Sequence, residues 1–594
     1  MKFLHFFWLV ILVTPIYGQE DFLARQYFND GEFEKATIYY ENLVARIPRR
    51  SDYAENLVTC YQQLEQYDKA EEFLRKRLAS IASYPTLYVD LGQNYRLQDS
   101  LSVAREYYEK AHETVLENPN FGYAIGFRFQ RYTLLDDALR AFTKAMELDP
   151  QLNYGLQIAR IYGEQGKIDQ MFNAYLDIID QPDSPKENTM QRIDYYLSED
   201  AQAQNNQILR KILLQRAQRS PNTLWNELLS WLFVNQNQFY NAFTQEKAIY
   251  KRSVGTTLER MSTLGELALE KDAVEDANEI FEYILKNGTD PVILLNAQLN
   301  LIDIDLLELG QARIVKARKK FEELETLYGY QNETLQLQIA YANFLTFKDE
   351  NPNKGQEVLK RTLELPLSRY SEGYVKLALG DILVYDRKFN EALILFSQIQ
   401  KRLKNDVLGQ EARFKVAQTS FYKSDFDWAL TQLKVLRGST SQLIANDAMQ
   451  LSLLIADNTF EDSTQTALKK YARADLLAYQ NKTDEAISSL ETILKEHKGE
   501  QIEDEAMLKL GELFFSKKDY NQAEFNFRKV VEFYPQGILA DDAHFALGEL
   551  YRNQLNDPER AKTHYERIIY DFQDSYFFPQ AQKQFRIMRG DIVN

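Results

Sequence analysis

The sequence predicts an all-α protein built as a solenoid of helix-turn-helix hairpins. Gly (23) and Pro (14) together make about 6% of the 594 residues, against a usual share of roughly 12%. Small and aromatic residues return every 34 residues near the N-terminus, and the apolar residues between them follow the 3–4 spacing of amphipathic helices. The scarcity of turn-forming residues excludes a β-sandwich or barrel. The long period favours a repeat array.

Residues 1–18 are predicted to be a secretory signal peptide. Lys2 precedes an apolar run from Phe3 to Val13, and Gly18 is a small residue at the expected cleavage point. The run is shorter than the roughly 20 apolar residues that span a bilayer. An uncleaved anchor and a buried N-terminal helix stay open as alternatives. Because Cys60 is the one cysteine and lies far inside the chain, no cysteine for lipid attachment follows the signal.

The next segment, residues 19–182, is predicted to be an N-terminal repeat array because its residue columns keep one register. Small residues stand 34 positions apart, each with a bulky residue four positions later and an aromatic residue nine positions earlier. A hairpin cannot bury both of its faces alone, so neighbouring hairpins must stack. The small column is Ala36, Ala70, Ala104 and Ala138, and the aromatic column is Tyr27, Tyr61, Tyr95 and Phe129.

The repeat at residues 85–118 resembles the tetratricopeptide repeat family. Its matching residues are Tyr88, Leu91, Gly92, Tyr95, Ala104, Tyr108 and Ala111. The resemblance implies an all-α superhelical solenoid of about 12–15 helix-turn-helix repeats. Twelve repeats are recognised by their small-residue column and Gly355 marks a thirteenth. After the first four, the column continues at Met171, Ala242, Ala277, Ala392, Ala429, Ala486, Ala523 and Ala561.

The remaining chain divides into a middle region, residues 183–366, and a C-terminal array, residues 367–594. Within the middle region, residues 183–220 and 290–350 keep a helical spacing but lose the small-residue column. We interpret both stretches as degenerate helical pairs, which either bend the solenoid or form an interface. The segment Ala581–Arg589 is predicted to be a closing helix.

The C-terminal repeats resemble those of bacterial cell-envelope proteins, including cell-division coordinators and outer-membrane-assembly lipoproteins. The resemblance is carried by Leu510–Phe514, Tyr534-Pro535 and Ala540–Tyr551. The composition also resembles exported repeat proteins of Bacteroidetes-type bacteria. Unlike the lipoproteins, this chain has no acylated cysteine, so membrane association is expected only through partners. We expect an exported, periplasmic protein, with a peripheral position at the outer membrane as an alternative.

No enzymatic motif is found, and the protein is predicted not to be an enzyme. The chain has neither a phosphate loop nor a dinucleotide, nucleophile-elbow or zinc-protease motif. His544 and His564 can meet across one repeat, but satisfied histidines on a hairpin are the simpler interpretation, so neither metal nor cofactor is expected. The net charge of −17 argues against a nucleic-acid partner.

The candidate site is the groove that the resemblance places on the first helices of the repeats beginning at residues 504 and 541. Four carboxylates there lie beside three apolar side chains, and such a groove favours a basic or amphipathic segment of a partner protein. A solvated acidic helix face is the alternative. The candidate residues are Glu505, Leu508, Glu512, Phe515, Asp542, Phe545, Glu549 and Arg552.

The sequence therefore predicts a non-catalytic scaffold or adaptor in a bacterial cell-envelope or secretion assembly. Two alternatives stay open at this stage. The protein could be a permanent structural subunit of an outer-membrane complex, or an envelope enzyme or its regulatory subunit.

Overall fold

The computed structural model describes residues 20–80, 84–182, 184–220, 222–253, 257–308, 310–438, 441–459 and 464–590. These residues form α-helices and two short 3-10 helices, and no strand occurs among them. The predicted signal peptide, residues 1–18, lies outside the described residues. The chain divides into two compact units, Met1–Trp225 and Asn226–Asn594, and the boundary falls within α13 (Thr223–Asn235).

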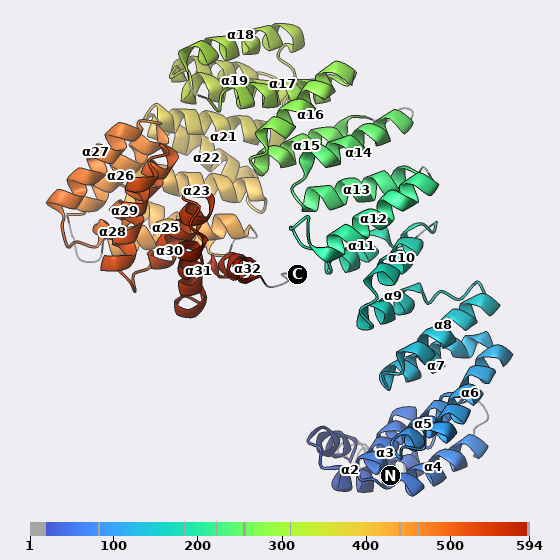
Figure 1. The fold of residues 1–594 in the computed structure, drawn as a ribbon. Helices are drawn as coiled ribbons and strands as arrows, with labels where there is room; N and C mark the ends of the chain where they lie inside the picture. Colours follow the sequence, from blue (N-terminus) through green and yellow to red (C-terminus); the bar gives the residue numbers. More distant parts are fainter. Residues whose placement is uncertain are drawn as a thin grey trace, which may run out of the picture. The chain divides into compact units, whose positions relative to one another are not determined.

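The first unit is a series of antiparallel helical hairpins (Figure 1). A helix at residues 20–29 opens it. The following helices are α2 (Phe33–Arg46), α3 (Ser51–Gln63), α4 (Tyr67–Ser80), α5 (Thr86–Arg96), α6 (Leu101–Glu117), η1 (Pro119–Phe121), α7 (Gly122–Arg131), α8 (Leu135–Leu148), α9 (Gly155–Glu164), α10 (Ile168–Ile179), α11 (Lys186–Asp194) and α12 (Gln204–Arg219).

The second unit continues the same hairpin architecture. Its helices are α14 (Phe239–Arg252), α15 (Glu259–Glu270), α16 (Val274–Asn287), α17 (Pro291–Asp305), α18 (Gln311–Tyr328), η2 (Asn332–Thr334), α19 (Leu335–Phe347), α20 (Pro352–Thr362), α21 (Arg369–Tyr385), α22 (Phe389–Arg402), α23 (Val407–Tyr422), α24 (Phe426–Leu436), α25 (Gln442–Asp457), α26 (Thr466–Tyr479), α27 (Thr483–Glu496), α28 (Ile502–Ser516), α29 (Tyr520–Phe533), α30 (Ala540–Asn553), α31 (Pro558–Asp571) and α32 (Phe578–Arg589). The predicted closing helix corresponds to α32.

The predicted small-residue column is confirmed. All thirteen of its members are buried, Gly355 included. The residue five positions before each member has a positive φ, as in Glu65 before Ala70 and Lys518 before Ala523. This left-handed residue ends the first helix of the hairpin, where a backbone N–H such as that of Gln66 closes the turn on the carbonyl of Tyr61, 2.8 Å away. Each small residue therefore lies in the first turn of the second helix, at a fixed offset from the left-handed residue.

Close packing within the hairpins depends on glycines that face aromatic rings. A Cβ placed on such a glycine would lie within 2.2–2.7 Å of a ring carbon, much closer than the roughly 3.5–4.0 Å of carbon contacts. Glycine is therefore required where the two helices cross. The pairs are Gly92–Tyr108, Gly126–Phe142, Gly265–Phe281, Gly380–Phe396, Gly511–Phe527 and Gly548–Tyr565.

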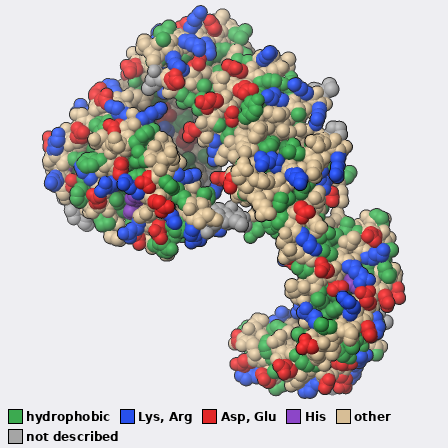
Figure 2. All heavy atoms as spheres, viewed as in Figure 1, with side chains coloured by type: hydrophobic (Ala, Val, Ile, Leu, Met, Phe, Trp, Pro, Cys, Tyr) green, Lys and Arg blue, Asp and Glu red, His purple; other side chains and the backbone are tan. Residues whose placement is uncertain are grey.

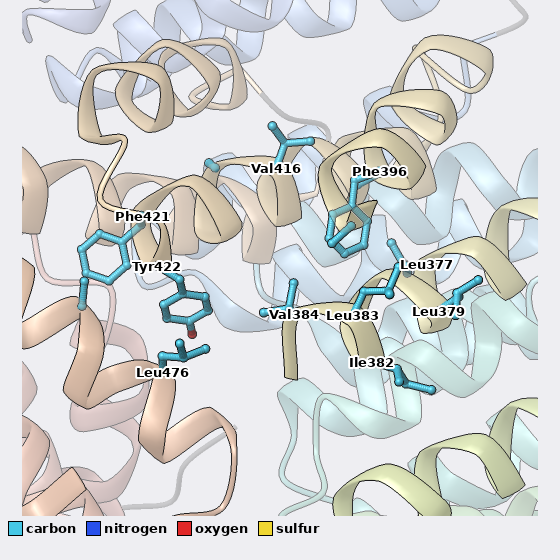
Figure 3. Close-up of a cluster of buried hydrophobic side chains, with 14 of the residues drawn as sticks. Leu377, Leu379, Ile382, Leu383, Val384, Phe396, Val416, Phe421, Tyr422 and Leu476 are labelled. Carbon is cyan, nitrogen blue, oxygen red and sulfur yellow. The ribbon is translucent and has the colours of Figure 1, made fainter. Parts of the chain in front are cut away.

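Both degenerate stretches are helical, as predicted. Residues 183–220 contain α11 and α12, and residues 290–350 contain α17, α18 and α19. The second stretch joins the largest buried apolar cluster, which runs from Leu295 to Leu513 through the second unit. Figure 3 shows part of this core, where Tyr422 of α23 points toward Leu476 of α26.

The second unit brings together helix ends that are far apart in sequence. The Asn481 amide donates to the backbone carbonyl of Phe347 at 2.9 Å, and the Gln480 amide donates to that of Tyr385 at 2.6 Å. The Tyr479 ring also packs edge-on against Phe347, with 5.8 Å between ring centroids. The turn after α26 therefore fixes the C-terminal ends of α19 and α21.

A buried ionic cluster links three successive repeats in the first unit. The Arg128 guanidinium donates to both carboxylate oxygens of Asp90, at 2.9 and 3.1 Å, and to Glu55. The Tyr132 hydroxyl donates to Asp90 at 2.8 Å. The Arg128 and Asp90 side chains are only 11% and 5% exposed, so their charges depend on each other.

Candidate functional site

The eight predicted partner-binding residues lie on two helices, α28 and α30. The first four, Glu505, Leu508, Glu512 and Phe515, lie on α28, and the other four lie on α30. Glu512 and Phe515 are exposed, whereas the other six are half-buried. Burial raises the pKa of Asp542, and the charge of Glu512 contributes to the increase, so charges on the two helices of the predicted site interact.

The α30 half of the predicted site is largely engaged by the chain itself. The Phe545 ring stacks on Phe577 with 4.3 Å between centroids. The Tyr565 hydroxyl donates to Glu549 at 2.6 Å, and Arg552 lies 3.9 Å from the same carboxylate. Phe577 comes from the segment that closes the array, and Tyr565 comes from α31 of the same hairpin, so both side chains cover part of this half.

In the α28 half, one lysine pairs with two carboxylates. Lys509 bridges Asp475 of α26 at 3.1 Å and Glu512 at 3.3 Å. Burial disfavours the Lys509 charge, but the two carboxylates outweigh it and raise the lysine pKa. Glu505 accepts one hydrogen bond from the Asn458 amide at 3.0 Å, and burial raises its pKa well above the ordinary value.

A cavity among the described residues lies elsewhere, over α17, α19 and α21. Its volume is about 610 Å³, within the 300–1,000 Å³ or so that is typical of ligand pockets. A second cavity of about 340 Å³ shares four of its residues and extends along α21 to Asp381. We call the two together the α19 groove. The first cavity is lined by Asp303, Leu306, Leu335, Gln336, Ile339, Ala340, Asn343, Phe344, Phe347, Lys348, Ser371 and Tyr374.

Local sequence fixes where the helices of the α19 groove begin. The Asp290 side chain caps α17 by accepting from the N–H groups of Val292 and Ile293, and Pro291 occupies the first helical position. Ser368 caps α21 by accepting from the N–H of Ser371 at 3.1 Å. Neither capping residue lines the cavity, although Ser371, which Ser368 caps, does. The caps fix where α17 and α21 begin.

The floor of the groove is apolar and its rim is polar. Ile339 and Phe347 are half-buried and Tyr374 is 55% exposed, so apolar surface stays in contact with water. Asp303 and Lys348 lie on the rim as exposed charges of opposite sign. The Asn343 amide makes no hydrogen bond to any described residue. The groove can bury an apolar side chain and offer a hydrogen bond to the backbone that carries it.

Sequence reasoning missed this groove because α17 and α19 lie in the stretch 290–350, which departs from the repeat pattern. A signal does exist, since α19 carries apolar residues around its whole circumference. Tyr341 and Leu345 face the core, while Leu335 and Ile339 face the groove. An amphipathic surface helix is expected to be polar on the second face.

The histidines and the cysteine are placed as structural groups. His544 and His564 do meet, with 2.9 Å between their Nδ1 atoms. No group of three or more His, Cys, Asp or Glu side chains in the described ranges could hold a metal ion. Cys60 is fully buried, and burial raises its thiol pKa to about 11, which opposes the reactive thiolate form.

The visible surface carries charges of both signs. Figure 2 shows Lys and Arg side chains interspersed with Asp and Glu on the face it presents. None of the described helices is both long enough and apolar enough to cross a bilayer.

Comparison with known proteins identifies tetratricopeptide repeats in the C-terminal part. Models of the family match residues 471–538 and 542–575, which include all eight predicted site residues. A general transcriptional corepressor, trfA, of Dictyostelium discoideum is 28% identical over 130 residues, and the BBSome complex member BBS4 of Bos taurus is 29% identical over 129 residues. Each alignment covers 22% of this chain, and they cover 9% and 24% of those relatives.

Two solved structures are similar at low overall agreement. Naa15/Naa10 bound to HypK-THB has a TM-score of 0.33 and 12% identity, with 96% of this chain and 85% of that chain covered. The APC/C hetero-tetramer Cut9-Hcn1 has a TM-score of 0.26 and 14% identity, with 88% and 95% covered.

Proposed function

We propose that this protein is a non-catalytic scaffold of a bacterial cell-envelope or secretion assembly, and that it binds an amphipathic segment of a partner protein in the α19 groove. The observation that carries the proposal is a cavity of about 610 Å³ with an apolar floor, which lies over the first helices of three successive hairpins. Burying that floor is favourable at about 25 cal/mol per Å² of apolar surface. The tetratricopeptide repeats at the C-terminus support a binding role, and the absence of an enzymatic motif supports the non-catalytic part.

The chemistry of the groove defines the segment that fits. Ile339 and Phe347 require aliphatic or aromatic side chains. Asn343 supplies an unused amide for the backbone of an extended or helical segment. Asp303 and Lys348 at the rim suit charged residues that flank the apolar ones. An amphipathic segment meets all of these requirements, whereas a uniformly charged one does not.

The proposal is tested with a groove variant and a matched control. A photo-crosslinking amino acid at Tyr374 identifies the partner segment, and a synthetic peptide of that segment is then titrated against purified protein. Ile339→Lys places a charge in the floor and is expected to weaken binding at least tenfold, or about 1.4 kcal/mol. Ile394→Lys, on the 57% exposed outer surface of α22, should leave binding unchanged. Equal affinity of the two variants would show that the segment binds elsewhere.

Export is proposed from residues 1–18 alone. The mature protein should begin at Gln19 and fractionate with the periplasm, which N-terminal sequencing of the native protein checks. A native protein that retains Met1 in the cytoplasm would contradict this part without affecting the groove.

A further inference from the structure

A small cavity in the first unit is bordered by α3, α4 and α5. Its volume is about 20 Å³, somewhat more than the roughly 10–15 Å³ that one water-sized atom needs. The first residues of α3 and α5 line it, and neither helix has a side-chain cap. Helix N-termini favour anions, but alone they identify no ligand. We call this cavity the Arg77 recess and define it by Ser51, Glu55, Arg77, Thr86, Asp90 and Arg128.

Arg77 of α4 provides an independent observation. The residue is 8% exposed, and its Nε atom is buried and donates to no residue that the structure describes. Its Nη1 atom donates to the backbone carbonyl of Pro48 at 2.9 Å, and its Nη2 atom makes no hydrogen bond within the described ranges. A buried donor normally has an acceptor, and a buried charge normally has a partner of opposite sign. Arg77 lines the recess and has neither at its Nε atom.

The carboxylates of the recess are already paired with other arginines. Asp90 accepts from Arg128 at 2.9 and 3.1 Å, and the two oxygens of Glu55 accept from Arg128 and Arg131. Burial opposes the Arg128 charge, but Asp90 and Glu55 outweigh it and raise its pKa. Burial lowers the pKa of Arg77, by contrast. Three guanidinium groups therefore meet two carboxylates, and the charge that lacks a close partner is that of Arg77.

The free edge of Arg77 has the geometry of a carboxylate receptor. Because Nη1 is used by Pro48, the remaining edge carries the N–H groups of Nε and Nη2, which are parallel and match the two oxygens of a carboxylate. Other arginines of this chain use the same edge for that purpose. Nε and Nη2 of Arg50 donate to Asp52 at 3.0 and 3.2 Å, and those of Arg260 donate to Glu246 at 2.8 and 2.6 Å.

We propose that the Arg77 recess binds one carboxylate group, whose two oxygens accept from Nε and Nη2 of Arg77. The volume admits the oxygen that meets the buried Nε atom, while the rest of the group stays at the mouth. Glu55 and Asp90 nearby disfavour a second negative charge, so a monovalent carboxylate fits better than a phosphate. Such a group comes from a free small carboxylate or from an acidic side chain of a partner protein. The site lies in the first unit and does not depend on the α19 groove.

The experiment titrates sodium acetate into the purified full chain at pH 7.5, with saturation-transfer difference NMR of the acetate methyl group as the readout. Wild type should give a saturable signal. Acetamide, which has the same shape but no charge, should bind about tenfold more weakly or worse. Arg77→Lys keeps the charge but loses the parallel donors, and should weaken acetate binding about tenfold or more. Arg77→Met should abolish binding yet unfold at the same or a higher temperature, because it removes a buried charge that has no ion-pair partner.

Arg50→Lys is the matched control, because the same edge of Arg50 is already occupied by Asp52. It should bind acetate like wild type. Equal acetate affinity of wild type and Arg77→Lys, equal affinity for acetamide, or displacement of acetate by equimolar chloride would each overturn the proposal.

A second ligand distinguishes the two sources of the carboxylate. The peptide N-acetyl-Gly-Glu-Gly-amide carries the group on a glutamate side chain. Affinity at least equal to that of acetate supports the site and assigns it to a partner's acidic side chain, whereas affinity about tenfold lower supports the site and assigns it to a free small carboxylate. A failure of the acetate titration leaves the Ile339→Lys test of the α19 groove unaffected.

Discussion

The contact between Gly380 and Phe396 gives the sharpest test of how the hairpins pack. A Cβ at residue 380 would lie 2.3 Å from Cε1 and 2.6 Å from Cζ of the Phe396 ring. The ring is fully buried, so it has no free space into which to move. Gly380→Ala gains about 1 kcal/mol of helix propensity. Overpacking of a filled core costs about 1–3 kcal/mol. The clash outweighs the gain, and we expect a net destabilisation of up to about 2 kcal/mol.

The assay is urea unfolding followed by circular dichroism, with hydrogen exchange of α21 and α22 as the local readout, because repeat arrays need not unfold in one step. Phe396→Leu removes the clashing ring atoms, so Gly380→Ala should be tolerated in that background. The coupling energy is expected to be about 1 kcal/mol or more. Gly438→Ala is the matched control, since no atom lies within 4 Å of the added carbon, and it should stabilise by about 0.4–1 kcal/mol. The reasoning fails if Gly380→Ala is as stable as Gly438→Ala, or if the double variant is additive.

Three further predictions follow from the charges and the thiol. Arg128→Ala should destabilise the first unit by about 3–5 kcal/mol in urea unfolding, because it leaves the buried Asp90 charge without its partner. Arg140→Ala breaks an exposed ion pair and should cost less than about 1 kcal/mol. Similar losses in the two variants would contradict the account. Burial lowers the pKa of His544 and of His564 from 6.5 to about 4. The unfolded chain therefore binds about two more protons than the folded chain near pH 5, and the free energy of unfolding should fall as pH drops from 6.5 to 4. Replacing both rings by Phe should flatten that dependence, and an unchanged slope would assign it to other groups. Cys60 should react with a thiol reagent only after unfolding, and fast stoichiometric labelling of the native protein would refute its burial.

The repeat architecture was predictable because it depends on the spacing of residues within a single hairpin. A small residue such as Ala104 must lie in the first turn of the second helix, and a residue such as Asp99 must adopt the left-handed turn conformation five positions earlier, so both recur with the period. Gly92 recurs for the same reason, since its neighbour Tyr108 lies in the same hairpin. Local spacing thus determines each hairpin, and the hairpins determine the fold class.

The site was only partly predictable, because its chemistry depends on residues from other repeats. Phe545 was expected to be an open apolar contact, but Phe577 of the closing segment stacks on it. The carboxylate of Glu512 was expected to be available, but Lys509 engages it together with Asp475 from the preceding repeat. No spacing within α28 or α30 reveals these neighbours.

The α19 groove was hidden for a related reason. Ile339 lies on a helix that is apolar all round, and sequence alone cannot tell whether such a face is covered. Its exposure depends on where α17 and α21 lie, and these helices depart from the repeat pattern or follow a segment that does. The position of α21 is itself fixed by contacts of Gln480, almost 100 residues later in the chain.

The most direct test of the central proposal is the yield of photo-crosslinks at Tyr374 in the α19 groove relative to the yield at Ile394 on the outer surface of the next helix. The two side chains are 55% and 57% exposed, so solvent access does not bias the comparison. We expect a discrete adduct at Tyr374 whose crosslinked peptide is amphipathic, and little or none at Ile394. Equal yields at the two positions, or adducts confined to Ile394, would contradict partner binding in this groove.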